Sequence, residues 1–557
     1  MSAAGRVHEA FRRMAAADRP EVWITLRSEA DVAREAELVD TRRAAGEPLP
    51  LAGVLVAVKD NIDVEGIPTT AGSAAFAYEP EADATAVARL REAGAIVLGK
   101  TNLDQFATGL VGTRSPFGAV RNARRPDRIS GGSSSGSAVA VALGFVDLAL
   151  GTDTAGSGRV PAALNGIYGV KPSVGLIPAT GVVPACRSID VVTVFGRDLG
   201  LARRAAELME GPDGIDPLAR PRPGLPGLPA APRIAIPTPD HLEGLADGWA
   251  EEFGRVVDRL ARSGVEIVEV DIAPLLEAAA LLYGGSFVAE RTAAVGDFIR
   301  EHPELVGSDL DPTVAGIVLG GDACTAVEVF RDRERLERLG LEGAKRLEGT
   351  AALLTPTTTW HPTLAEVASD PVGANARMGR FTNFANLLDY ASLAVPAGAV
   401  DGAPYGVMLS GPAGSDRQLA ELARLIAEAP LDLLVVGAHL EGQPLNHQLV
   451  AAGGRLKARV RTAAEYRLHA LDTVPPKPGV RRVVQGGEAI EGEVWTLPAS
   501  GFGAFVAALP QPMTIGRVTL EDGSSVAGFH AEHLAVDGAA DITRFGGWRR
   551  YLEQRAQ

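Results

Sequence analysis

Two stretches rich in serine and glycine have the clearest chemical potential in this chain of 557 residues. The first, 130–137, reads SGGSSSGS, and the second, 151–159, reads GTDTAGSGR. Loops of small residues let backbone N–H groups converge on one point, as a developing oxyanion requires. The hydroxyls supply nucleophiles, so the pattern favours nucleophilic catalysis. A phosphate cradle and a flexible linker are the alternatives, although a linker would not be flanked so closely by apolar runs.

A serine nucleophile needs a base to take its proton, and the sequence offers two kinds. No histidine lies between His8 and His241, although a distant one could fold in. Lys59 directly follows the apolar run 54–58, and burial would lower its pKa because the charged form loses its hydration. A neutral lysine can accept a proton. The alternative, which spacing alone favours, is a strand-end lysine that reaches solvent.

One motif in the sequence points to a different chemistry. Residues 94–101, GAIVLGKT, match the phosphate-loop pattern GxxxxGK[ST]. The four residues between the glycines, AIVL, favour a strand, whereas a phosphate loop needs these positions in the loop itself. We therefore interpret the match as chance and Lys100 as a structural residue.

Alternating helix and strand patterns surround these loops and predict an α/β fold. Strands are expected at 54–58 and 95–98, and residues 1–47 read as helical and polar. Helices are expected at 137–143 and at 83–93, the latter with Asp83 as its N-cap and Gly94 as its stop. After a Pro/Gly-rich connector at 211–232, the same order continues with a helix around 253–260 and a strand at 265–270.

A second boundary is predicted near Pro430. Beyond it, short strand-like segments beginning with 433–437 are separated by Gly and Pro, as in a predicted turn at 475–479. We expect two domains. Residues 1–430 would form a mixed-sheet core flanked by helices, and residues 431–557 a smaller α+β domain.

Composition excludes several classes of function. The net charge of −15 argues against a nucleic-acid partner and means that an anionic substrate must meet a locally placed cation. Cys186 and Cys324 are the only cysteines, too few for a disulfide framework or a Cys-based zinc site. No metal cluster or cofactor motif stands out. Residues 1–18 lack the apolar core of a signal peptide, and the apolar stretch 137–151 is interrupted by Asp147 and too short to span a bilayer. We expect a soluble, cytoplasmic protein.

The order of Lys59, 131–136 and 151–157 resembles that of the amidase signature family, and the likeness covers roughly residues 50–430. It implies a linear-amide hydrolase with a Ser-Ser-Lys triad. Ser157 would be the nucleophile, Lys59 the base, and Ser133, which follows a cis peptide bond in this family, the relay. The oxyanion N–H groups would come from Ser157 and from Thr154, Ala155 and Gly156. Asp153 and Arg159 are interpreted as a structural pair. Glycine is common in relatives where this chain has Ser135 and Ala155.

Three further segments resemble the allophanate hydrolase subfamily: 105–116, 283–291, and 436–440 together with 444–449. This likeness implies a small anionic amide as substrate, cleaved to ammonia and carbon dioxide in urea degradation. Tyr283, Arg291 and Gly109 would contact it. A guanidinium can bind a carboxylate with two parallel hydrogen bonds. The spacing places Tyr283 and Arg291 on one helical face, and the alternative for Arg291 is a surface pair with Glu290 or Glu301.

The C-terminal domain has two interpretations. In related proteins it is linked to decarboxylation of the first product, for which His439 and His447 are candidate bases. Either could equally be a structural histidine, and the domain could serve assembly instead. The resemblance also implies a homodimer and a urea carboxylase as pathway neighbour. Competing functions are hydrolysis of a neutral amide by another amidase-family member, glutamine hydrolysis within an amidotransferase, and a non-catalytic scaffold.

Overall fold

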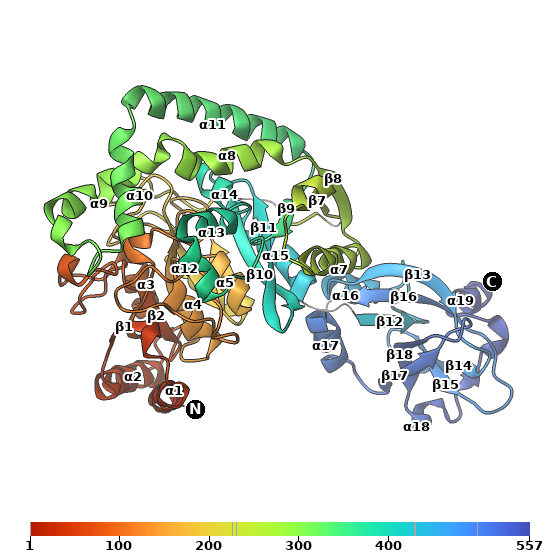
Figure 1. The fold of residues 1–557 in the computed structure, drawn as a ribbon. Coiled ribbons are helices and arrows are strands. Elements are labelled where there is room, and N and C mark those ends of the chain that lie inside the picture. Colours follow the sequence, from red (N-terminus) through yellow and green to blue (C-terminus); the bar gives the residue numbers. More distant parts are fainter. Residues whose placement is uncertain (1, 225–226, 230, 428–430, 498, 557) are drawn as a thin grey trace. The chain divides into compact units, whose positions relative to one another are not determined.

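The computed structural model describes residues 2–224, 227–229, 231–427, 431–497 and 499–556 (Figure 1). Two compact units are formed, one by Met1–Val257 with Glu266–Ala423 and the other by Asp258–Val265 with Arg424–Gln557. The predicted boundary near Pro430 falls at 428–430, which lies outside the described residues. The two-domain division at that position therefore stays a prediction.

The first unit is built on one mixed sheet, which in the described residues has 11 strands. In spatial order the strands are β1 (Trp23–Leu26), β3 (Ile96–Thr101), β2 (Leu55–Lys59), β4 (Leu148–Asp153), β6 (Val191–Gly196), β5 (Tyr168–Lys171), β10 (Ala391–Val400), β11 (Ala403–Gly411), β9 (Ala352–Pro356), β7 (Arg233–Pro237) and β8 (Glu266–Val270). The strands β3, β2 and β4 run parallel, as do β9, β7 and β8, and the pairs between these two groups are antiparallel.

Helices flank this sheet, as the α/β prediction requires (Figure 1). Before residue 428 they are α1 (Ala3–Ala17), α2 (Glu29–Ala44), α3 (Thr85–Glu92), α4 (Ser135–Ala142), α5 (Val160–Asn165), α6 (Leu199–Met209), α7 (Trp249–Arg262), α8 (Ala273–Gly284), α9 (Ala289–Glu301), α10 (Pro312–Gly320), α11 (Ala326–Arg346), α12 (Leu364–Ser369), α13 (Pro371–Met378), α14 (Asn383–Leu387) and α15 (Asp416–Ala427). The predicted fold class is confirmed.

The core lies on both faces of the sheet because successive strand residues point to opposite sides. Leu55 and Ala57 of β2 pack in one apolar cluster with residues of α1, α2 and α4. Val56 and Val58 pack in a second cluster with residues of α3 and α6. The strand β2 is thus buried on both faces, and Lys59 leaves the sheet from a dry core.

The parallel pairing of β2 with β4 determines where the predicted catalytic loops meet. Val58 lies opposite Leu150, so Lys59 and the loop after Asp153 emerge at the same edge of the sheet. The helix α4, which follows the first serine-glycine stretch, contacts both of these strands. Three segments far apart in sequence therefore converge there.

Several local predictions are wrong. Asp83 does not cap α3, whose N-cap is Ala84; its carboxylate instead accepts hydrogen bonds from Glu65 N and the Arg91 guanidinium. The strand β1 interrupts the region 1–47 that was expected to be helical. The predicted turn at 475–479 is also wrong, because residues from Lys477 onward pair with β14.

The phosphate-loop match is indeed chance. The strand β3 runs through it to Thr101, and Lys100 is fully buried with its Nζ 3.2 Å from the carboxylate of Asp60. Lys100 is therefore structural, as predicted.

The second unit contains two small sheets. One has the order β13 (Arg455–Arg461), β16 (Glu491–Leu497), β12 (Leu431–Val435), β18 (Ser525–Ala531) and β17 (Met513–Thr519), and the other β15 (Lys477–Arg482), β14 (Tyr466–Leu471) and β19 (Ala540–Asp541). Its helices are α16 (Asn446–Ala451), α17 (Ala499–Ala507), α18 (His533–Val536) and α19 (Trp548–Ala556). This is the α+β organisation expected from the sequence.

Within the described residues, no single helix is long and apolar enough to cross a membrane. One pair of helical segments bent by 99°, Pro312–Ala323 with Ala326–Arg346, meets the criteria of length and composition when taken together.

Candidate active site

Lys59 is the centre of a buried polar cluster. Its side chain is fully buried, and Nζ donates to Ser133 Oγ at 2.8 Å and to Thr152 Oγ1 at 2.7 Å. Burial lowers the pKa of Lys59 to about 7, although the nearby carboxylates of Asp104 and Asp190 oppose this shift. The alternative of a strand-end lysine in solvent is wrong. At neutral pH a substantial fraction of Lys59 is uncharged and can accept a proton.

Ser133 lies between Lys59 and the following helix. Its peptide bond with Gly132 is cis, as the family resemblance implied. The side chain is fully buried, and the carbonyl oxygen accepts a hydrogen bond from Asp104 N at 3.0 Å. Lys59 and Ser133, two of the three predicted triad members, are thus in direct contact.

Ser157 is buried at the start of the loop beyond β4, and its hydroxyl donates to the carbonyl oxygen of Gly109 at 3.4 Å. Among the hydrogen bonds of the described residues, none joins Ser157 to Ser133 directly. Serine hydroxyls turn readily between staggered rotamers, and catalytic hydrogen bonds are often incomplete without substrate. The geometry therefore brings Gly109 to the predicted nucleophile and leaves the relay contact unmade.

The loop before Ser157 presents unpaired backbone donors. In the described part of the chain, the N–H groups of Thr154, Ala155, Gly156 and Ser157 have no hydrogen-bond acceptor. Gly156 has φ +141°, and a Cβ there would lie 2.5 Å from Thr382 Oγ1. Glycine is therefore required at that position by conformation and by space. Successive free N–H groups of this kind can bind an oxyanion.

Two buried carboxylates support this loop. Asp153 forms an ion pair with Arg159 at 2.8 Å, both side chains being fully buried, which fits the predicted structural role. Asp190 accepts from Thr154 Oγ1 at 2.5 Å and from Ala185 N at 2.7 Å. The position of the oxyanion loop is thus set by ionic and hydrogen-bonded contacts on both sides.

Arg291 is a buried guanidinium without a carboxylate partner. It is 1% exposed, and Nη1 donates to Thr108 Oγ1 at 2.9 Å and Nη2 to the hydroxyl of Tyr283 at 3.2 Å. In the described residues, no carboxylate oxygen lies within 4.0 Å of it. The alternative surface pair with Glu290 is wrong, since Glu290 accepts from Ser188.

Tyr283 and Arg291 do not share a helix, contrary to the expectation from spacing. Tyr283 ends α8 and Arg291 lies in α9, with a short 3-10 turn between them. The guanidinium nevertheless lies 5.2 Å over the Tyr283 ring. The break at 285–288 therefore folds the two side chains together by a different route.

The turn formed by 104–109 connects the arginine to the nucleophile. Thr108 Oγ1 accepts from Arg291, and the next residue, Gly109, supplies the carbonyl that accepts from Ser157. Phe106 and Ala107 have φ values of 49° and 53°, a left-handed backbone that is unusual for residues with a Cβ. Such backbone strain concentrates at functional sites.

Sequence reasoning missed Thr108, Thr152, Asp104 and Asp190. A polar residue at the end of an otherwise apolar strand was an available signal for Thr152. The other three act through contacts between distant segments, which no local pattern reveals.

The two C-terminal histidines do not come together with the cluster around Lys59. His439 is buried, its ring stacks 5.1 Å from that of Phe529, and Nε2 lies 3.0 Å from Gln448 Oε1. Burial lowers the pKa of His439. His447 is exposed, with Nδ1 3.0 Å from the carbonyl oxygen of Pro444. These contacts are those of a packed histidine and a surface histidine.

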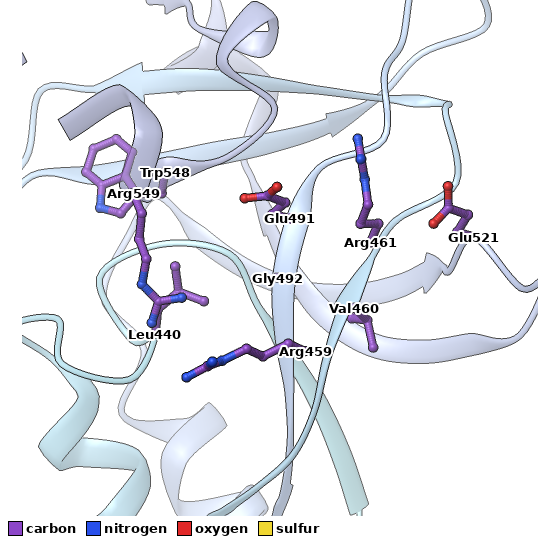
Figure 2. Close-up of a pocket in the computed structure, with 9 residues that line it drawn as sticks. All are labelled: Leu440, Arg459, Val460, Arg461, Glu491, Gly492, Glu521, Trp548 and Arg549. Atoms are coloured by element: carbon purple, nitrogen blue, oxygen red, sulfur yellow. The ribbon is translucent and has the colours of Figure 1, made fainter. Parts of the chain in front are cut away.

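A cavity of about 380 Å³ in the second unit does not include either histidine (Figure 2). It is lined by Leu440, Arg459, Val460, Arg461, Glu491, Gly492, Glu521, Trp548 and Arg549. Arg549 donates to the buried carboxylate of Glu493 at 2.9 Å, and Arg459 to Glu441 at 2.8 Å. Most of the positive charge at this cavity is therefore already neutralised. In the described residues, no group of three or more His, Cys, Asp or Glu side chains could hold a metal ion.

Comparison with known proteins finds two family matches along the chain. Residues 6–420 match the amidase family, and residues 431–553 match the allophanate hydrolase C-terminal domain. Allophanate hydrolase of Kluyveromyces lactis has a solved structure that is 39% identical, with a TM-score of 0.73 over 100% of this chain and 97% of that one.

Curated relatives include the urea amidolyase of Saccharomyces cerevisiae, 41% identical over 95% of this chain and 31% of its own length. The chain thus spans about a third of that relative. The 2-amino-5-chloromuconic acid deaminase of Comamonas testosteroni is 34% identical over 70% of this chain and 84% of its own length. From the family match and these relatives, the chain belongs to the amidase family and is an amidohydrolase.

Proposed function

We propose that this chain hydrolyses allophanate, releasing ammonia, with Ser157 as nucleophile, Ser133 as relay and Lys59 as base. The observation that carries this proposal is the buried, unpaired guanidinium of Arg291. Leaving such a charge without a partner is costly, so a site that keeps it is suited to an anionic ligand. Allophanate, a urea that bears a carboxylate, fits this requirement. The similarity over the whole length of an allophanate hydrolase also supports it.

The proposed reaction begins with proton transfer. Ser157 turns from Gly109 toward Ser133, its proton passes to Ser133, and the proton of Ser133 passes to neutral Lys59. The serine oxygen attacks the terminal amide carbonyl, and the free N–H groups of 154–157 stabilise the oxyanion. The relay then returns a proton to the leaving ammonia. Water cleaves the acyl ester by the same route and frees N-carboxycarbamate, which decarboxylates.

In the proposed complex, Arg291 and Tyr283 bind the substrate carboxylate, and Gly109 lies beside the nucleophile. A guanidinium and a phenol can both donate to carboxylate oxygens. The contact of Arg291 with Thr108, next to Gly109, supports a short separation between the carboxylate and the scissile amide. A small substrate such as allophanate requires this short separation.

The pH dependence of the reaction follows from the pKa of Lys59. That pKa is lowered to about 7 by burial, and only the uncharged amine can act as base. We expect kcat/KM for a neutral amide to rise with pH, through a midpoint near 7, to a plateau. The measurement is kcat/KM between pH 5 and 9. A neutral amide is used so that the substrate does not itself titrate. A midpoint near 4, typical of a carboxylate base, would contradict the assignment of Lys59.

Ammonia release from allophanate, biuret, malonamate and a simple neutral amide tests the proposed substrate. We expect kcat/KM to be far higher for allophanate than for the neutral amide, because only the anionic substrates can pair with Arg291. Preferred hydrolysis of the neutral amide would leave the triad in place but would remove allophanate as substrate. Glutamine and a tRNA-dependent assay would then be next, since a glutamyl-tRNA(Gln) amidotransferase component is among the relatives.

The role of the second unit is a separate proposal. The ring contacts of His439 support a structural role for it, and exposed His447 is then the remaining candidate for a decarboxylation base. We further propose that a urea carboxylase supplies the allophanate. The much greater length of the urea amidolyase relative leaves room for such a second activity. The homodimer and the cytoplasmic location stay predictions from family resemblance.

A further inference from the structure

Asp104 is a buried carboxylate for which the proposed mechanism has no role. It follows β3, and its side chain is fully buried. Oδ2 accepts from Val111 N at 3.1 Å and Gly112 N at 3.0 Å, and Oδ1 accepts from Arg114 N at 3.0 Å. In the described residues, no lysine, arginine or histidine nitrogen lies within 4.0 Å of it. Its negative charge is held by backbone N–H groups alone.

The carboxylate lies between the segments that carry the two catalytic serines. A Cβ added to Gly132, which precedes Ser133, would lie 2.1 Å from Asp104 Oδ2. A Cβ added to Gly109, whose carbonyl accepts from Ser157, would lie 2.6 Å from the same oxygen. The backbone N–H of Asp104 donates to the carbonyl of Ser133. One side chain therefore fixes the spacing of both glycine segments.

Asp104 also acts on Lys59 through its charge. Four charged groups influence Lys59: Asp104, Asp190 and Asp153 favour its protonated form, and Arg291 opposes it. Asp104 is the strongest of these three carboxylates. Burial alone would lower the pKa of Lys59 further, so the base would lose proton affinity without this charge. A base with too little proton affinity is a weak acceptor, and Brønsted behaviour then slows the reaction.

We propose that Asp104 is a positioning residue for the reaction, holding Gly109 and Ser133 at their separation and maintaining the proton affinity of Lys59. It touches no reacting atom. This inference rests on the proposed triad but not on allophanate as the substrate.

The test is the rate at which a fluorophosphonate labels Ser157 in the full chain, measured from pH 5 to 9. This rate reports the reactivity of the nucleophile without any choice of amide substrate. We expect wild type to show a midpoint near pH 7. Asp104→Asn should lower the plateau rate by about 10- to 100-fold, as expected for a misplaced nucleophile. Its midpoint should lie at lower pH, because the charge that favours protonated Lys59 is gone. An unchanged midpoint or an unchanged plateau overturns the proposal.

Asp216→Asn is the matched control. Asp216 is 7% exposed and accepts from Ala179 N and Leu218 N, so it too is a buried carboxylate bound by backbone donors. It is not among the charges that influence Lys59. We expect its midpoint to equal that of wild type, even if the thermal stability falls. A shift of the midpoint in this control would show that loss of any buried carboxylate produces the effect, and would overturn the proposal.

Asp104→Glu keeps the proposal falsifiable if Asp104→Asn does not fold. Glutamate retains the charge, but the contacts at Gly109 and Gly132 leave no room for an added methylene. We expect a lower plateau with the wild-type midpoint, and a wild-type plateau overturns the positioning role. Wild type that is not labelled at Ser157 refutes the triad and this inference together. Wild type that is labelled but ignores allophanate refutes only the proposed substrate.

Discussion

Replacing Ser157 with alanine is expected to lower kcat for ammonia release from allophanate by at least about 10³-fold. The hydroxyl is the only group proposed to form the acyl ester, and water has no comparable activation at this site. Lys59→Met should cause a loss of similar size, because a serine without its base is a poor nucleophile. The measurements are steady-state ammonia release and fluorophosphonate labelling. Labelling should be absent in Ser157→Ala and slow in Lys59→Met.

Ser410→Ala is a suitable control for these variants. Ser410 is also a buried serine, but it pairs with Ser392 across β10 and β11 and has no contact with Lys59. Its activity should equal that of wild type. If Ser157→Ala keeps more than a tenth of the wild-type rate, another residue is the nucleophile. If Ser157→Ala is inactive while Lys59→Met stays fully active, the proton leaves by another route.

Arg291→Ala is the second change with a large expected effect. It removes the proposed partner of the substrate carboxylate, and truncation of a buried, charge-assisted pair costs about 2–5 kcal/mol. We expect kcat/KM for allophanate to fall by roughly 10²-fold or more, at about 1.4 kcal/mol for each factor of ten. The value for a neutral amide should change little or even rise. Arg291→Lys should recover part of the loss, because an ammonium supplies the charge without the planar pair of donors.

Arg300→Ala, on the same helix, controls for the loss of an arginine from α9. Arg300 is exposed and pairs with Asp297 and Asp322. Its substrate preference should match that of wild type. Equal losses for allophanate and the neutral amide in Arg291→Ala would assign Arg291 a structural role. Circular dichroism and thermal melting would separate that outcome from unfolding.

The triad was predictable because its members lie in strongly patterned segments. An apolar strand ending in Lys59 and two glycine-rich loops have few interpretations, and resemblance to one family selected among them. The contact of Lys59 with Ser133 agrees with that prediction. The position of Ser157 was harder to predict, because its hydroxyl bonds Gly109, and a serine rotamer depends on neighbours from other segments.

The errors in the prediction share a physical cause. Asp83 was expected to cap α3, but two other segments compete for its carboxylate through Glu65 N and Arg91. Tyr283 and Arg291 were placed on one helix by counting residues, whereas the chain breaks between them. The unpaired state of Arg291 was not visible either, because it depends on which carboxylates fold nearby. Local patterns predict elements well, and tertiary competition decides the partners.

The separation of the proposed recognition residues from the triad has a consequence for the evolution of this family. Lys59, Ser133 and Ser157 are carried by β2, α4 and β4 with their loops, whereas Tyr283 and Arg291 come much later, from α8 and α9. The two groups meet at Thr108, a single side chain. A lineage could therefore exchange the α8–α9 stretch and acquire a new substrate while inheriting the chemistry unchanged. Thr108 is the position at which such an exchange would have to remain compatible.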